Sequence, residues 1–130
     1  SDTPPVVEKA RQPCFLVICR DRPGSAQLRQ EHLNGHLAHV EKNWRRYVTA
    51  GPMREPGEDA IIGSVFLVLA NSLDEAKTLM NGDPYLQCGM YESVEYKLLV
   101  NSIGQYIGGK IWESADAIAT AQRAGRLEQS

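Results

Sequence analysis

The 130-residue chain has no apolar run that approaches the 18 or more residues of a membrane-spanning helix. It also has no excess of positive charge, since 14 Lys and Arg stand against 16 Asp and Glu for a formal net charge of −2. Proteins that bind nucleic acid normally carry a strongly basic surface. We therefore expect one ordinary globular domain, with neither a membrane-spanning segment nor a nucleic-acid partner.

Cysteine is scarce as well. The chain has three cysteines, Cys14, Cys19 and Cys88, and an odd number without a secretion signal does not suggest a disulfide framework. Residues 1–12 are polar and contain two prolines, whereas a signal peptide would open with a charged and then an apolar stretch. We expect reduced thiols and a cytoplasmic protein.

The sequence pattern divides the chain into three parts. Residues 1–13 combine prolines and charges without periodic apolar positions, which is typical of a flexible lead-in. The folded domain is predicted over residues 14–112. Residues 113–130 form an Ala-rich C-terminal extension that we expect to be helical.

Four strands and two helices are predicted inside the domain. Continuous or alternating apolar segments predict strands at 14–19, 47–53, 60–70 and 94–100, of which 60–70 should be central. One helix follows the turn at 21–25, and its core-facing stripe is Leu33, Leu37, Val40, Trp44 and Tyr47, at spacings of four and three. The other helix lies between a capping box that begins at Ser72 and the stop signal Asn81-Gly82.

This order of elements, β-α-β-β-α-β, is the split βαβ or ferredoxin-like arrangement. It is an α+β fold with both helices on one face of an antiparallel sheet. The strands at 14–19 and 60–70 are apolar on both sides, so the sheet face without helices also needs a cover. A second copy of the chain would provide it, and we expect a homodimer.

Three histidines fall on the first predicted helix, His32, His36 and His39, at spacings of four and three. Histidines four apart can chelate zinc, but Leu33 stands where a zinc protease carries its general-base Glu. Solvated surface histidines are the ordinary interpretation, and we apply it to His39. A single histidine can also act as a general base near neutral pH if a partner orients it. No metal or other cofactor is predicted.

Asp83 is the candidate partner, because it follows the second helix directly. The two helices of this fold lie side by side, so a carboxylate at the end of one can approach a histidine on the other and fix its tautomer. Ordinary turn chemistry at Asp83-Pro84 remains the alternative. Cys88 follows closely and could line the same cavity, although packing explains a cysteine there equally well.

The chain resembles the YciI-like (YCII-related) family from about Phe15 to Trp112. The resemblance rests on the order and spacing of short motifs: Asp21-Arg22-Pro23-Gly24-Ser25, Leu28-Arg29, His36-Leu37-Ala38-His39, Ala50-Gly51-Pro52, Gly63-Ser64 and Asp83-Pro84-Tyr85, with Gly89 and Glu92. The fold of this family is a ferredoxin-like α+β domain whose sheets pair into a dimeric α/β barrel. This agrees with the sheet face that needs a cover.

The resemblance also implies a site and an activity. His36 and Asp83 match the family's proposed active-site pair, and relatives include small enzymes acting on ring-cleavage or chlorinated aromatic intermediates. We expect a cofactor-independent lyase or isomerase that moves a proton on a small substrate, with His36 as acid and base and Asp83 as its orienting group. A non-catalytic small-molecule binding or accessory protein that uses the same cavity is the alternative.

Four further residues are expected to bind the substrate. Three of them, Arg29, Ser64 and Tyr85, lie in the matched motifs, and the fourth is Cys88.

Overall fold

The computed structural model describes residues 12–105 and 109–110. The chain divides into two units, of which one, Gln12–Leu99, is a compact domain. In the other unit, β5 (Ile103–Gly104) pairs with β6 (Gly109–Lys110) as a short antiparallel hairpin. In the described part of the chain, no helix is both long and apolar enough to cross a membrane.

The predicted terminal segments fall largely outside this description. Residues 1–11 of the lead-in and the whole extension at 113–130 are not among the described residues. The carbonyl of Pro13, at the end of the predicted lead-in, accepts a hydrogen bond from the Ala70 amide.

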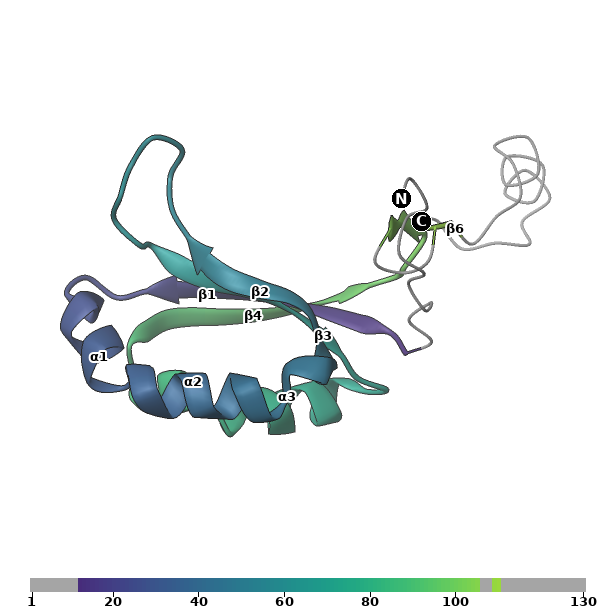
Figure 1. Cartoon of the computed structure of the whole chain (residues 1–130), viewed down its shortest axis with the longest axis horizontal. Helices are drawn as coiled ribbons and strands as arrows, with labels where there is room; N and C mark the ends of the chain where they lie inside the picture. The colour runs from purple at the N-terminus through teal and green to yellow at the C-terminus, as the bar shows by residue number, and fades with distance from the viewer. Residues whose placement is uncertain (1–11, 106–108, 111–130) are drawn as a thin grey trace, which may run out of the picture. The chain divides into compact units, whose positions relative to one another are not determined.

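The domain alternates strands and helices in the predicted order (Figure 1). Its elements are β1 (Cys14–Asp21), α1 (Ser25–Glu31), α2 (Leu33–Lys42), the 3₁₀ turn η1 (Trp44–Arg46), β2 (Tyr47–Met53), β3 (Gly63–Leu69), α3 (Leu73–Asn81), α4 (Pro84–Gln87) and β4 (Tyr91–Leu99). The α+β class and the antiparallel ferredoxin-like sheet are thereby confirmed.

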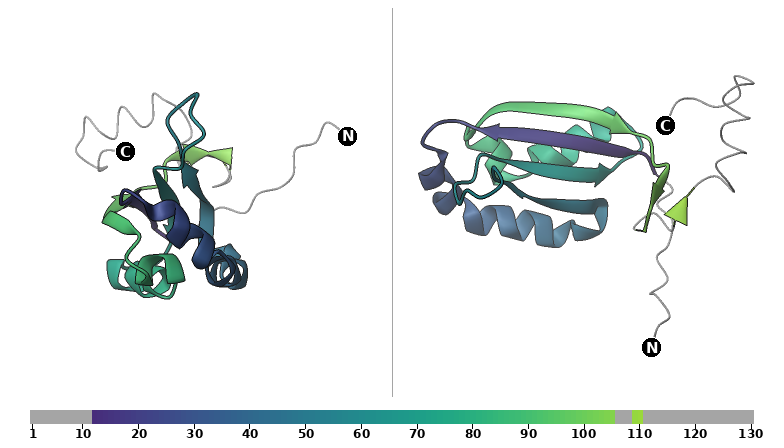
Figure 2. Two further views of the ribbon diagram at one scale, coloured as in Figure 1. Left: turned by 90° about the vertical axis from the view of Figure 1, so that its left-hand side faces the viewer. Right: turned by 90° about the horizontal axis from the view of Figure 1, so that it is seen from above.

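The four strands form one antiparallel sheet in the order β2-β3-β1-β4. The central pair is β1 and β3, in register with Val17 opposite Phe66. All helices cover one face of this sheet, as the end-on and top views in Figure 2 show. The strand predicted at 60–70 is central but shorter than expected, because residues 60–62 precede β3 as an irregular segment.

The closed core lies between the sheet and α3. Phe15, Val17 and Cys19 point from β1 toward the helices, and α3 buries Ala76 and Met80 against them. The predicted cap of α3 is present, since the Ser72 hydroxyl accepts a hydrogen bond from the Glu75 amide, and α3 ends at Asn81. Burial of this apolar helix face is the main stabilising contribution on this side of the domain.

The first helix differs from the prediction, because it is broken in two at His32. The predicted core-facing stripe is confirmed at Tyr47, which packs against the core, but is wrong for Leu33, Leu37 and Trp44. No residue of α2 is buried, and the exposed fractions are 42% for Leu33, 48% for Leu37 and 61% for Trp44, which lies in η1. The apolar side of α2 therefore faces a space that the protein itself does not fill.

The apolar side of α2 is exposed because the helix packs sideways on α4. Gly35 lies so close to Pro84 that a Cβ atom at this position would be 2.9 Å from the Pro84 Cγ. One turn further along α2, the His39 ring lies against Gly82. Two glycines thus allow a close lateral contact, which positions α2 beside α4 and leaves the space beneath the sheet open.

A pair of truncations tests this unequal packing. We expect Met80→Ala to lower the free energy of unfolding by about 2–5 kcal/mol, because it leaves a cavity at a fully buried position. Leu37→Ala should change it by about 0.5 kcal/mol or less, because the side chain is about half exposed. Urea unfolding followed by circular dichroism measures both. Equal losses would show that α2 contributes to the core as much as α3.

Candidate active site

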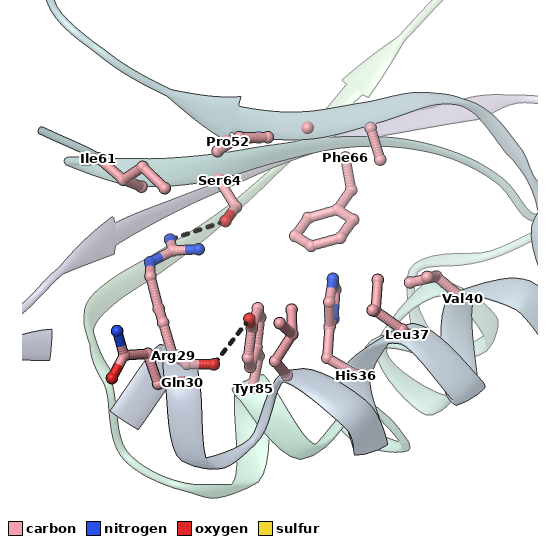
Figure 3. A pocket seen from close by; sticks show the side chains of 13 residues that line it. Arg29, Gln30, His36, Leu37, Val40, Pro52, Ile61, Ser64, Phe66 and Tyr85 are labelled. Atoms are coloured by element: carbon pink, nitrogen blue, oxygen red, sulfur yellow. Dashed lines mark hydrogen bonds between the residues drawn. The ribbon is translucent and has the colours of Figure 1, made fainter. Parts of the chain in front are cut away.

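The space under α2 is a cavity of about 420 Å³ between α1, α2, α4 and the strands β2 and β3 (Figure 3). Its walls are mainly apolar and include Leu37, Val40, Pro52 and Phe66. A small number of polar groups at one end interrupt these walls. Apolar concavities with a few convergent polar groups are typical of small-molecule sites.

His36 and Asp83 form the central pair. The His36 Nδ1 lies 2.8 Å from Oδ2 and 3.0 Å from Oδ1 of Asp83, whose side chain has no exposed surface. A carboxylate can only accept, so the imidazole carries its proton on Nδ1 and donates it to Asp83. The other ring nitrogen, Nε2, has no partner among the described residues, and the ring projects into the cavity (Figure 3).

Asp83 is held by its position at the start of α4. Its backbone is extended, Pro84 occupies the first helical position, and its Oδ1 accepts a hydrogen bond from the Tyr85 amide at 2.9 Å. The residue is thus a helix cap, as the turn interpretation suggested, and the partner of His36 at the same time. The two alternatives are compatible because a carboxylate has two oxygens with several acceptor positions.

Tyr85 fixes the plane of the imidazole. Its ring is stacked on His36 with centroids 3.9 Å apart and an interplanar angle of 6°, and Phe66 approaches the imidazole edge-on at 6.4 Å. The Tyr85 hydroxyl donates to the Arg29 carbonyl at 3.1 Å. Because that hydroxyl is already bonded, Tyr85 is placed to orient His36 with its ring face.

Arg29 and Ser64 form the polar end of the cavity. Arg29 donates from Nε and Nη2 to the two Asp21 oxygens at 2.8 Å each, and from Nη2 to the Ser64 hydroxyl at 3.0 Å. The Tyr91 hydroxyl also donates to Ser64, at 2.9 Å. Ser64 therefore accepts twice and keeps its own proton, while Nη1 of Arg29 has no partner among the described residues.

The structure brings four of the expected site residues together at the cavity: Arg29, His36, Ser64 and Tyr85. Asp83 lies directly behind His36. Cys88, however, is not among the lining residues, because its thiol is turned toward the Tyr85 carbonyl, 3.5 Å away at the end of α4.

Two residues of the site were not recognised as such in the sequence. Asp21 was interpreted as turn chemistry, yet its carboxylate holds Arg29 in place from eight residues away. Tyr91 was not singled out at all. The pair of Asp21 and Arg29 does have a signal in the sequence. An acidic residue stands at the end of a strand, and an arginine follows on the next helix.

The other histidines take no part in the cavity. The expectation that His39 is solvated is wrong, since its ring packs on Gly82 and its Nε2 is buried without a hydrogen-bond partner among the described residues. His32 caps the junction between α1 and α2. Within residues 12–105, no group of three His, Cys, Asp or Glu side chains is close enough together to hold a metal ion.

Burial and the negative charge of Asp83 affect the groups around the pair. Burial, followed by Asp83, raises the pKa of Cys19 to about 12 from an ordinary value of 9.0. The same two causes raise the pKa of Tyr47 to about 12. Burial also raises the pKa of Tyr91 well above that of a free tyrosine. These groups stay neutral in the folded protein at moderately alkaline pH.

This arrangement predicts how stability depends on alkaline pH. The unfolded chain releases the Cys19 proton near pH 9 and the Tyr47 proton near pH 10, but the folded chain keeps both until about pH 12. The stability that these two groups contribute should therefore be fully present below pH 9, and the free energy of unfolding should fall between pH 9 and 12. Urea titrations across this range measure it. Tyr47→Phe removes one of the groups with a raised pKa and should make the decline shallower; an unchanged slope would contradict the assignment.

Comparison with known proteins identifies relatives of the whole domain. The YCII-related domain matches residues 14–100. The chain is 30% identical over 90 residues to protein YciI of Escherichia coli and of Shigella flexneri, covering 64% of this chain and 92% of each relative. It is also similar to the solved structure of 5-chloro-2-hydroxyhydroquinone dehydrochlorinase from Burkholderia phenoliruptrix AC1100 in complex with 2,5-dihydroxybenzoquinone. That match has a TM-score of 0.62 at 27% identity and covers 72% of this chain and 97% of the other.

Proposed function

The chain belongs to the family of YCII-related domain proteins, and from that premise we propose that it is a small cofactor-independent lyase or isomerase. Its substrate is a ring-derived or aromatic catabolic intermediate, and its reaction is a proton transfer. His36 is the acid and base, and Asp83 orients it. The observation that supports this most directly is the Nδ1 contact of 2.8 Å, which leaves Nε2 facing the cavity.

The chemistry of the pair suits either reaction type. In an elimination of HCl, Nε2 takes a proton from the substrate, the electrons of the broken bond form a new double bond, and chloride leaves. In an isomerisation, the same imidazolium returns the proton to another atom of the substrate. In both reactions the positive charge that develops on His36 is stabilised by the buried carboxylate of Asp83.

The polar end of the cavity is suited to substrate oxygens. Nη1 of Arg29 and the hydroxyl proton of Ser64 are two donors, and both groups are held by other hydrogen bonds. Fixed donors can stabilise negative charge on a hydroxyl or quinone oxygen while the proton is removed. The dehydrochlorinase whose fold is similar was solved with 2,5-dihydroxybenzoquinone, a compound with four such oxygens, and this supports a ligand of the same kind here.

Substitution of the pair tests the proposal, with 5-chloro-2-hydroxyhydroquinone as the first substrate and chloride release as the readout. His36→Ala should lower kcat by about 10²- to 10⁴-fold, the usual contribution of a positioned general base. Asp83→Asn should also lower it, because the new amide can still cap α4 through its oxygen but presents an N–H to Nδ1. The imidazole would then carry its proton on Nε2, where it cannot act as a base.

His32→Ala is the matched control, since this histidine directly precedes α2 but does not line the cavity. It should retain wild-type turnover. Full activity in His36→Ala would refute the catalytic role. Binding of 2,5-dihydroxybenzoquinone without turnover of any ring substrate would instead favour the non-catalytic binding function.

A homodimer completes the proposal. On the sheet face opposite the helices, Leu16 and Ile18 of β1 lie opposite Leu67 and Val65 of β3, and all four are only half-buried. An apolar sheet face of this kind needs a cover, and a second copy presents a complementary one by symmetry.

Light scattering on the purified protein should therefore give twice the mass of the chain at micromolar concentration. Leu67→Glu places a charge in the middle of this face and should produce a folded monomer. Leu73→Glu, at an exposed position on α3, is the control and should remain dimeric. A wild-type monomer would contradict the dimer.

A further inference from the structure

A second hollow of about 490 Å³ lies beside the candidate active site, between the end of α2, η1 and β2. It shares Leu37, Val40 and Ala50 with the first cavity, so the two hollows adjoin along α2 and are here called one cleft. Trp44 and Tyr47 line it as well, together with Thr49 and the charged residue Glu41. The cleft is therefore polar at Arg29 and Ser64 and apolar at Trp44, with His36 between.

The apolar part of the cleft is exposed to water. Trp44 is the extreme case at 61% exposed, and Leu37 is about half exposed. The Arg45 guanidinium lies 4.8 Å from the centre of the Trp44 ring, which helps to hold this large side chain in place. Large apolar side chains arranged along a cleft and left in contact with water indicate a surface that buries an apolar group of a ligand.

The helix itself sets the scale of that group. Val40 lies one turn, or about 6 Å of helix rise, beyond His36, and Trp44 follows the end of α2 in η1. The apolar part therefore extends past the end of the helix. An arm that lies in it would run along α2 away from Arg29. A ligand consisting of one ring would fill only the first cavity and leave the second empty.

We propose that the cleft binds a ring compound that carries an apolar arm: the oxygen-bearing ring lies at His36 and Arg29, and an alkyl or aryl substituent extends past Val40 to Trp44. This rests on the proposed function for the position of the ring. A ligand arm is favoured over a second copy of the chain because the hollow adjoins the cavity and shares three wall residues with it. It also lies on the helix side of the sheet, whereas the copy is expected on the opposite face.

Calorimetric binding of two probes to the wild-type protein tests the proposal. The probes are 2,5-dihydroxybenzoquinone and 2,5-dihydroxy-3-pentylbenzoquinone, which differ only in the arm. Each fully buried methylene increases affinity by about threefold to fourfold. In a cleft that is open on one side, we expect the pentyl compound to bind about 10- to 100-fold more tightly. Equal or weaker binding of the pentyl compound would overturn the proposal.

Trp44→Ala separates this site from general hydrophobic adsorption. It should reduce the affinity ratio of the two probes to about threefold or less, whereas Leu73→Ala, which truncates an exposed leucine on α3 outside the cleft, should preserve the full ratio. Circular dichroism verifies that both variants fold. A ratio that survives Trp44→Ala would overturn the proposal, and a loss of the dimer in that variant with an unchanged ratio would assign the hollow to a contact between copies.

Failure of the proposed function gives a different result. If neither probe binds, the ring does not belong at His36, and the function and its extension are both contradicted. If both probes bind equally, only the extension is contradicted.

Discussion

A carboxylate without any exposed surface must be paired, because an isolated charge in a protein interior is very unfavourable. Asp83 meets this requirement with two groups, the Tyr85 amide and the His36 imidazole. The bond from the Tyr85 amide is local, because Asp83 is the N-cap of α4. The second requires α2 to lie beside α4 at a fixed distance, and the contact between Gly35 and Pro84 provides that distance. Pairing of one buried charge therefore determines where the helix carrying the histidine can lie.

The consequence is an asymmetry between the two longer helices on the sheet, α2 and α3. α3 packs closely and closes the core around Met80. α2 is held laterally by α4 and leaves its apolar side, with Leu37 and Val40, over an open cleft. This exposure lowers the stability that the helix could contribute, and it creates a surface on which a small apolar ligand can be bound. Site formation and incomplete packing are thus the same feature of the fold.

Much of the fold could be predicted from the sequence because its signals are local. The bounds of β2 at 47–53 follow from a short apolar segment that ends at Gly-Pro, and the cap at Ser72 follows from its own side chain. The break at His32 has no such signal, since neither proline nor glycine is adjacent to it. The periodicity of α2 indicates an apolar face, but periodicity is the same whether that face meets a core or a cavity.

The same distinction applies to the site. The approach of Asp83 to His36 could be anticipated from the adjacency of two helices, and the resemblance to the family pointed to these positions. The packing of His39 on Gly82 and the orientation of Cys88 away from the cavity depend on side-chain directions that spacing does not encode. The ion pair of Asp21 with Arg29 is another such case. An aspartate in a turn looks the same in the sequence whether or not its carboxylate binds an arginine.

The central claim is that Asp83 places the His36 proton on Nδ1 and leaves Nε2 free to accept a proton in the cavity. Long-range proton–nitrogen correlation NMR of the neutral imidazole measures this directly, since the two ring nitrogens have distinct shifts according to which one is protonated. The account predicts the Nδ1–H tautomer in the wild-type protein and its reversal in Asp83→Asn. A wild-type His36 that carries its proton on Nε2 would contradict it.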